Sequence, residues 1–432
     1  MFITDTLYKL LKIFVCLWHS AFYHKIIVKG KNNIPKNSAI IFAPNHQNAI
    51  MDALAVLCTS GKDVTFLARS DFFSNKFFKI LLSFFKILPA YRINEGFSSV
   101  QNNKHTFNIA CKLLSQKKTI CIMPEGGHEG VKMLRNLKNG LFKIAFQAQE
   151  MMIDSSVFIV PVGIYYSSYT DFKSTLIINY GQPINVRSYI NYDNRNKSLI
   201  KLKEDLEMLL KDNIVHYNSK ELYNYFNYQM PFFIDYFVQM RSIATDYEAY
   251  LIERKIVEKL NTENALNIRK INLLKENINN SHIINLARYV KANKKVDVSL
   301  LFVIIASTII FMPIILACSI IYGVMFLASF TINSRIHDRQ FHSSVKYVFS
   351  FVFLTTISII IISYLVLILS NILSALFIGT CIIISILLFS EYIYFFKLVR
   401  DKIKVNINSK YIEEIREMVS EQLKVVGYDK II

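Results

Sequence analysis

Two side chains that can carry acid–base chemistry, His46 and Asp52, follow a short apolar run near the N-terminus. The run 40–43 stops at Pro44, which cannot donate to a sheet ladder, so a buried strand should end there. Strong helix formers begin at Ala49, which places His46 in a strand-to-helix turn at a sheet edge. A carboxylate that accepts one ring N–H of a histidine leaves the other nitrogen to take a proton from a hydroxyl. The pair therefore predicts a general base with its orienting partner.

The spacing of the pair restricts its geometry. Six helical steps rotate a side chain by about 240°, so His46 and Asp52 cannot share one helix face. They meet only if His46 precedes the helix and its ring folds back over the first turns, with Asn45 as the expected cap. A histidine at a helix end beside a solvent-facing aspartate remains the alternative for this motif alone.

A second strand closed by proline, 119–124, leads into the turn Glu125–Gly130. Three glycines in this turn let backbone N–H groups approach an anion or oxyanion closely, while Glu125 supplies a carboxylate at the same edge. The segment 137–140, which contains Lys138, then precedes a helix to about residue 150. A basic side chain and a helix N-terminus there can hold phosphate.

Strands alternate with helices over roughly the first 190 residues. This order predicts an α/β domain with a mostly parallel sheet flanked by helices, followed by a helical segment and C-terminal transmembrane hairpins. The expected strands are 25–30, 40–44, 64–69, 119–124, 157–164 and 175–180, and the expected helices of this part begin near residue 49, at 97 and at 140.

The remaining regions differ in composition. Residues 1–23 form an amphipathic helix, too short in its apolar run to span a bilayer, which we expect to lie on a membrane interface; packing on the chain's own core is the alternative. The domain assignment is 1–23 interfacial helix, 24–190 α/β domain with the candidate site, 191–297 helical appendage, 298–397 transmembrane or re-entrant hairpins, and 398–432 cytoplasmic amphipathic tail.

Apolar runs in the C-terminal part predict membrane segments. The run 299–332 suits a hairpin bent at Pro313, and 348–369 and 372–396 are long enough to span. Two hairpins place all basic flanks on one side, which the positive-inside rule assigns to the cytoplasm. We therefore expect an integral membrane protein whose active site faces the cytoplasm.

The composition of the chain limits the classes of molecule that it is expected to bind. Formal charge is +18, from 50 Lys+Arg against 32 Asp+Glu, and 53% of residues are hydrophobic. The charge suits nucleic acid or an anionic membrane, and the apolar segments favour membrane lipid over nucleic acid. The six cysteines include no C-x-x-C pair and no histidine at metal-ligand spacing, so neither a disulfide framework nor a metal site is indicated.

Four blocks in order resemble the glycerophosphate acyltransferase family, which includes the glycerol-3-phosphate and lysophosphatidate acyltransferases. They cover roughly residues 24–188, and four ordered blocks are far more specific than one. The blocks are Asn45-His46 with Asp52, Arg92, Pro124-Glu125-Gly126, and Ile159-Val160-Pro161-Val162.

The resemblance implies transfer of a fatty acyl group from a thioester, on coenzyme A or an acyl carrier protein, to the hydroxyl of a glycerol phosphate. His46 would be the base, oriented by Asp52, and Arg92 would bind the acceptor phosphate. The acceptor site would be shaped by Glu125 and Gly126, with Gly127, His128 and Lys138 beside them. No cofactor is implied beyond the thioester co-substrate.

The chain departs from the family pattern at two positions. Five residues rather than four separate His46 from Asp52, as in a subgroup of glycerol-3-phosphate acyltransferases, so we favour glycerol-3-phosphate over its 1-acyl derivative as acceptor. His128 replaces the usual arginine two positions after the glycine, which can shift the phosphate contact to Lys132, Arg135 or Lys138. The alternatives to an enzyme are a non-catalytic lipid-binding protein of the same fold and, more weakly, a transporter.

Overall fold

The computed structural model describes residues 2–91, 97–191, 194–227, 229–241, 245–262, 306, 312–369 and 371–425. The chain divides into two compact units. The first comprises residues 1–130, 134–214 and 338–344, and the second comprises 131–133, 215–337 and 345–432. The domain boundary expected at residue 190 stays a prediction.

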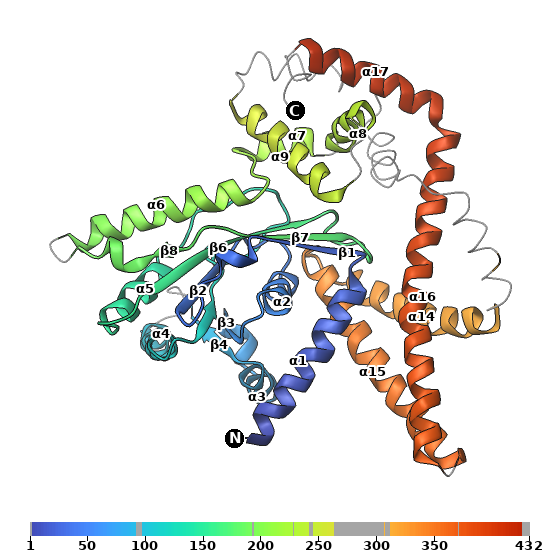
Figure 1. Ribbon diagram of the computed structural model, residues 1–432, viewed down its shortest axis with the longest axis horizontal. Coiled ribbons are helices and arrows are strands. Elements are labelled where there is room, and N and C mark those ends of the chain that lie inside the picture. The colour runs from blue at the N-terminus through green and yellow to red at the C-terminus, as the bar shows by residue number, and fades with distance from the viewer. Residues whose placement is uncertain are drawn as a thin grey trace. The chain divides into compact units, whose positions relative to one another are not determined.

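Within the described residues the strands form one eight-stranded sheet in the first unit (Figure 1). Its order is β1-β7-β6-β2-β5-β3-β4, with β8 also paired to β6. Only the pairs β6–β7 and β6–β8 are antiparallel, so the sheet is mostly parallel, as predicted. The strands are β1 Lys25–Lys29, β2 Ala39–Pro44, β3 Val64–Arg69, β4 Ile87–Ala90, β5 Thr119–Cys121, β6 Val157–Tyr166, β7 Thr175–Tyr180 and β8 Ile184–Asn185.

Strand β2 shows why the sheet is buried on both faces. Its alternate residues Ala39, Ile41 and Ala43 belong to the apolar cluster formed with α4 Phe97–Ser115, α5 Gly140–Glu150 and α6 Arg195–Asn213. Because successive strand side chains point to opposite faces, Phe42 faces the other side. There its ring lies 5.6 Å from that of Tyr180, whose hydroxyl is 2.7 Å from Thr59 Oγ1 on α2 Ile50–Thr59. Helices therefore cover both faces.

The edge strand β4 was not expected from the sequence, because Pro89 interrupts its apolar run. Pro89 lies opposite Ala68 of β3, which is the neighbour of β4 in the sheet order. An edge strand tolerates proline, since the missing N–H would have faced away from the sheet. The residues before it form a short helix, α3 Lys76–Phe84.

The N-terminal helix α1, Phe2–Phe22, packs against α2 and has an exposed apolar face. A disulfide between Cys16 and Cys58 joins these two helices, which corrects the expectation that no disulfide forms. The absence of a C-x-x-C pair carried no information about two cysteines 42 residues apart. The exposed apolar residues of α1 are Leu7, Leu10, Ile13, Phe14 and Leu17.

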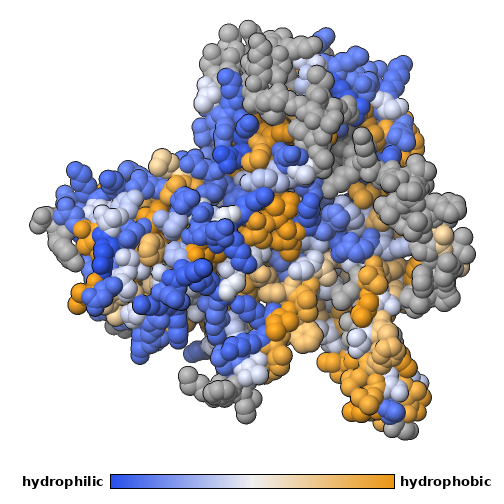
Figure 2. All heavy atoms as spheres, viewed as in Figure 1, coloured by the Kyte–Doolittle hydropathy of each residue, from blue (hydrophilic) through white to orange (hydrophobic). Residues whose placement is uncertain are grey.

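The second unit is helical in its described residues. In Figure 2 hydrophobic residues gather over the helical pair α15 and α16. Of the described helices, α15 alone is long and apolar enough to cross a membrane by length and composition. The span expected at 372–396 lies inside the longer α16 and stays a prediction, and most of the proposed first half of the 299–332 hairpin falls outside the described residues. The helices are α7 Lys220–Phe226, α8 Met230–Arg241, α9 Asp246–Thr262, α14 Met312–Asn333, α15 Phe341–Leu369, α16 Ile372–Ile407 and α17 Ser409–Val425.

Candidate active site

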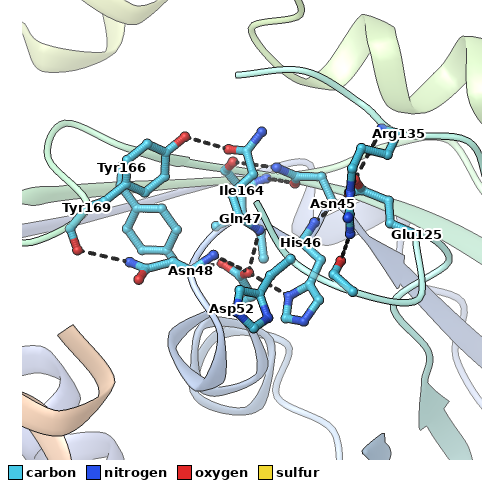
Figure 3. Close-up of polar contacts among 12 residues, drawn as sticks. Asn45, His46, Gln47, Asn48, Asp52, Glu125, Arg135, Ile164, Tyr166 and Tyr169 are labelled. Atoms are coloured by element: carbon cyan, nitrogen blue, oxygen red, sulfur yellow. Dashed lines mark hydrogen bonds and ion pairs between the residues drawn. The ribbon is translucent and has the colours of Figure 1, made fainter. Parts of the chain in front are cut away.

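His46 and Asp52 meet at the carboxyl end of β2 (Figure 3). His46 Nδ1 lies 2.9 Å from Asp52 Oδ2, and the histidine side chain is 16% exposed while the aspartate is fully buried. His46 precedes α2, and Asp52 is in its first turn. The ring therefore folds back over the helix start, as the spacing required, and the alternative of a solvent-facing aspartate is wrong.

Three further donors hold the Asp52 carboxylate. Oδ2 also accepts from the backbone N–H groups of Gln47 and Asn48, each at 2.8 Å. Oδ1 accepts from the Tyr166 hydroxyl at 2.8 Å, and burial, together with the Asp52 charge, raises the pKa of that phenol well above its usual value. A carboxylate surrounded by donors stays an acceptor, so it takes the Nδ1–H of His46 and leaves Nε2 as the free ring nitrogen.

The turn between β2 and α2 takes up five residues with an unusual backbone at Ala49. This residue is the N-cap of α2, with φ 44° and ψ −125°, and its side chain makes no capping hydrogen bond. The expected cap, Asn45, instead continues the β2–β6 ladder past Pro44: its Oδ1 accepts from Ile164 N at 2.7 Å and its Nδ2 donates to Ile164 O at 3.1 Å. An alanine in a region that favours glycine stores strain beside the candidate catalytic pair.

The Glu125–Gly130 turn lies against His46. The buried Glu125 accepts from His46 N at 2.7 Å through Oε1, and from Arg135 N at 3.1 Å and Arg135 Nε at 3.2 Å through Oε2. Burial raises the pKa of Glu125, and these hydrogen bonds and the guanidinium oppose the rise. Gly126 has φ +69°, and Gly127 O accepts from Arg135 Nη2. Glu125 thus links the turn that contains His46 to the segment that contains Arg135.

His128 brings a second imidazole to the pair. Its ring centroid lies 5.3 Å from that of His46 in a T-shaped arrangement with an interplanar angle of 75°. The exposed Lys138 has its side chain beside Gly126, where a Cβ would lie 3.0 Å from Lys138 Cγ. Both residues thus lie at the predicted sheet edge.

The other basic candidates are placed differently. Lys132 is buried and paired with Glu253 of α9, so it is not available to a phosphate. Arg135 neutralises Glu125. Arg92 lies outside the described residues, so its role as a phosphate ligand stays a prediction.

Sequence reasoning missed the residues that support the pair from β6 and the loop after it. Tyr166 is the last residue of β6, and Tyr169 donates its hydroxyl to Gln47 Oε1 at 2.8 Å. Tyr169 O also accepts from Asn48 Nδ2 at 3.3 Å. The tyrosines 165, 166 and 169 at the end of a buried strand were the available signal, since buried phenols need polar partners.

Part of this chain is similar to known proteins. Residues 25–165 match the family model described as Acyltransferase. A 1-acyl-sn-glycerol-3-phosphate acyltransferase of Borreliella burgdorferi is 28% identical over 205 residues, which are 46% of this chain and 74% of the relative. The crystal structure of the 1-acyl-sn-glycerophosphate (LPA) acyltransferase from Thermotoga maritima aligns with a TM-score of 0.35 at 18% identity, over 48% of this chain and 80% of that one.

The matched region, with a histidine and an aspartate at the end of its central strand, is an acyltransferase domain. The match covers the part of the chain that carries the four sequence blocks, and it supports their resemblance to the glycerophosphate acyltransferase family.

Proposed function

We propose that this protein transfers a fatty acyl group from an acyl thioester to a free hydroxyl of a glycerol phosphate, with His46 as the general base. The observation that carries the proposal is the hydrogen bond of 2.9 Å between His46 Nδ1 and the buried Asp52. That bond selects the tautomer in which Nε2 has the lone pair, and the carboxylate stabilises the ring once it is protonated.

The reaction needs one proton to move and one acyl bond to be exchanged. The acceptor hydroxyl gives its proton to His46 Nε2 as its oxygen attacks the thioester carbonyl carbon. The tetrahedral intermediate collapses to the ester and expels the thiolate, which takes the proton back from His46. The ring begins and ends neutral, and no covalent acyl-enzyme forms.

The acceptor is the finer part of the proposal. We take 1-acylglycerol-3-phosphate as the first candidate, because the similar Borreliella protein is named for that substrate. Glycerol-3-phosphate is the second candidate, favoured by the five residues between His46 and Asp52. In both cases the acceptor is a phosphate monoester, which suits the basic residues around the Glu125–Gly130 turn.

The protein is proposed to act at a membrane. Support comes from α15, which is apolar and long enough to cross a bilayer, and from the exposed apolar face of α1. The basic residues that flank the apolar C-terminal runs would then place the acyltransferase domain on the cytoplasmic side.

The deciding experiment offers radiolabelled acyl-coenzyme A, and then acyl carrier protein thioester, to the purified full chain with each of three acceptors: lysophosphatidate, glycerol-3-phosphate and dihydroxyacetone phosphate. We expect labelled phosphatidate or its 1-acyl precursor, and loss of product in His46→Ala. The exposed His105 of α4 provides a matched control, His105→Ala, which should keep activity. Full turnover by the His46→Ala variant would remove the base from the mechanism, and thioester consumption with none of the acceptors would refute the function.

A further inference from the structure

A short segment from far along the chain belongs to the acyltransferase unit. Residues 338–344 are part of the first compact unit, although the family model ends at residue 165. The segment connects α14 to α15 and includes the first turn of α15. The unit that contains the candidate active site therefore includes a stretch of sequence far beyond residue 214, where its longer stretches end.

Four contacts attach this segment to the candidate site, three of them to the Glu125–Gly130 turn. Asp338 Oδ2 lies 3.0 Å from His128 Nε2. The Phe341 ring packs against the His128 ring in a T-shaped contact with centroids 4.8 Å apart. With its amide oriented to match its neighbours, Gln340 accepts from Gly130 N at 2.6 Å. Ser343 donates its hydroxyl to Tyr169 O.

The result is two adjacent histidine–aspartate pairs. The first is His46 with Asp52, and the second is His128 with Asp338; the two rings are 5.3 Å apart. Their carboxylates differ, because Asp52 is fully buried under four donors whereas the side chain of Asp338 is 45% exposed. The two pairs are therefore suited to different chemical roles.

The chemistry of the second pair follows from which ring nitrogen is engaged. A carboxylate only accepts, so His128 donates Nε2–H to Asp338 and has Nδ1 left for a ligand. Among the described residues no hydrogen bond reaches His128 Nδ1. When protonated, this imidazole is a charged donor, and a charged donor next to the base suits an anionic oxygen of the acceptor.

We propose that Asp338 is a positioning residue for the acyltransferase site: it holds the His128 imidazole so that Nδ1–H binds the phosphate of the acceptor while the hydroxyl reaches His46. The proposal rests on the proposed function and names the part of that site which the C-terminal region supplies. Phe341 and Gln340 fix the segment to the turn, and Asp338 sets the orientation of the ring.

The test separates acceptor binding from chemistry. Asp338→Ala removes the partner of His128 but none of the His46–Asp52 contacts. We expect KM for the acceptor to rise roughly 10- to 100-fold, as for loss of a charge-assisted hydrogen bond, with kcat within about threefold and KM for the thioester unchanged. Asp338→Asn, which keeps an acceptor oxygen, should fall between. The neighbouring exposed Arg339 supplies the control Arg339→Gln, which should match wild type.

A double-mutant cycle shows whether Asp338 acts through His128. In a His128→Ala background, Asp338→Ala should have no further effect, because the residue it positions is gone. Equal effects in both backgrounds, or an unchanged acceptor KM in Asp338→Ala, would overturn the proposal.

A binding measurement keeps this test independent of turnover. The rise in melting temperature caused by lysophosphatidate or by glycerol-3-phosphate should be smaller in Asp338→Ala than in wild type. An inactive wild type that still shows this difference would refute the proposed function and leave the anion site standing. If the wild type is active but Asp338→Ala shows the same rise in melting temperature, the proposed role of Asp338 is refuted and the proposed function stands.

Discussion

Replacing Asp52 by asparagine tests the candidate catalytic pair with little change of shape. The amide oxygen can take the place of Oδ2 and keep the bonds from His46 Nδ1, Gln47 N and Asn48 N. The amide nitrogen then faces the Tyr166 hydroxyl, which can rotate to accept. The turn should therefore keep its geometry and lose only the negative charge.

The magnitude follows from the charge that develops on His46 in the transition state. Two unit charges about 4 Å apart interact by about 4 kcal/mol at an effective dielectric constant of about 20. Losing that interaction in the transition state alone should lower kcat about 1000-fold, with KM for both substrates nearly unchanged. In a serine protease triad the equivalent substitution acts in the same direction, chiefly through the tautomer of the histidine.

The assay is a single-turnover measurement with labelled acyl thioester and excess enzyme, which reports the chemical step. Unchanged thermal unfolding and thioester binding would establish that the variant is folded. A rate for Asp52→Asn within about threefold of wild type would refute the argument, since Asp52 would then serve only to hold the N–H groups of the turn.

Four further predictions concern residues around the site and the N-terminal helix. Tyr166→Phe removes one of the four donors to the Asp52 carboxylate, so kcat should fall about 10-fold; unchanged kcat would show that the hydroxyl is dispensable. Ala49→Gly should raise the free energy of unfolding by roughly 1 kcal/mol because it relieves the positive φ, and a lower midpoint in urea would contradict this. Cys58→Ala opens the link to Cys16 across 42 residues and should cost roughly 4 kcal/mol in a thermal melt, an effect that dithiothreitol should reproduce on wild type. Full burial lowers the pKa of His19 from 6.5 to about 3. Between these pH values only the unfolded chain takes up a proton at this residue, so the free energy of unfolding falls as the pH falls. Between pH 6.5 and 5 the wild type should lose roughly 2 kcal/mol of this free energy, and His19→Phe should lose less.

The sequence was sufficient where short-range patterns decide the structure. Pro44 ends β2, as expected. The uninterrupted apolar run before Pro44 indicates a strand that is buried on both faces, as β2 is. The six-residue spacing required His46 to lie before the helix, and the structure confirms that geometry. The ordered blocks predicted the similarity to acyltransferases, and residues 25–165 match the Acyltransferase family model.

Contacts between residues distant in sequence could not be read this way. Nothing in the local sequence links Tyr166 to Asp52, 114 positions apart, or Asp338 to His128, 210 positions apart. The cap was assigned to Asn45 because asparagine is a common N-cap, but pairing with Ile164 of the neighbouring strand satisfies both ends of its amide. Tertiary hydrogen bonds override local preference at that position.

The disulfide between α1 and α2 sets a distance as well as a stability. Cys58 lies six residues after Asp52 on α2, roughly 9 Å along the helix axis. The helix α1, with its exposed apolar face, is thereby tied covalently to the helix that bears Asp52, the candidate catalytic carboxylate. Were α1 to lie among lipid headgroups, the link would hold His46 at a constant height above the acyl chains, and the site would reach only hydroxyls presented at one depth of the bilayer surface. Reduction of that disulfide would then let the height of His46 above the bilayer vary, and the site would discriminate less between a lipid acceptor and a water-soluble one.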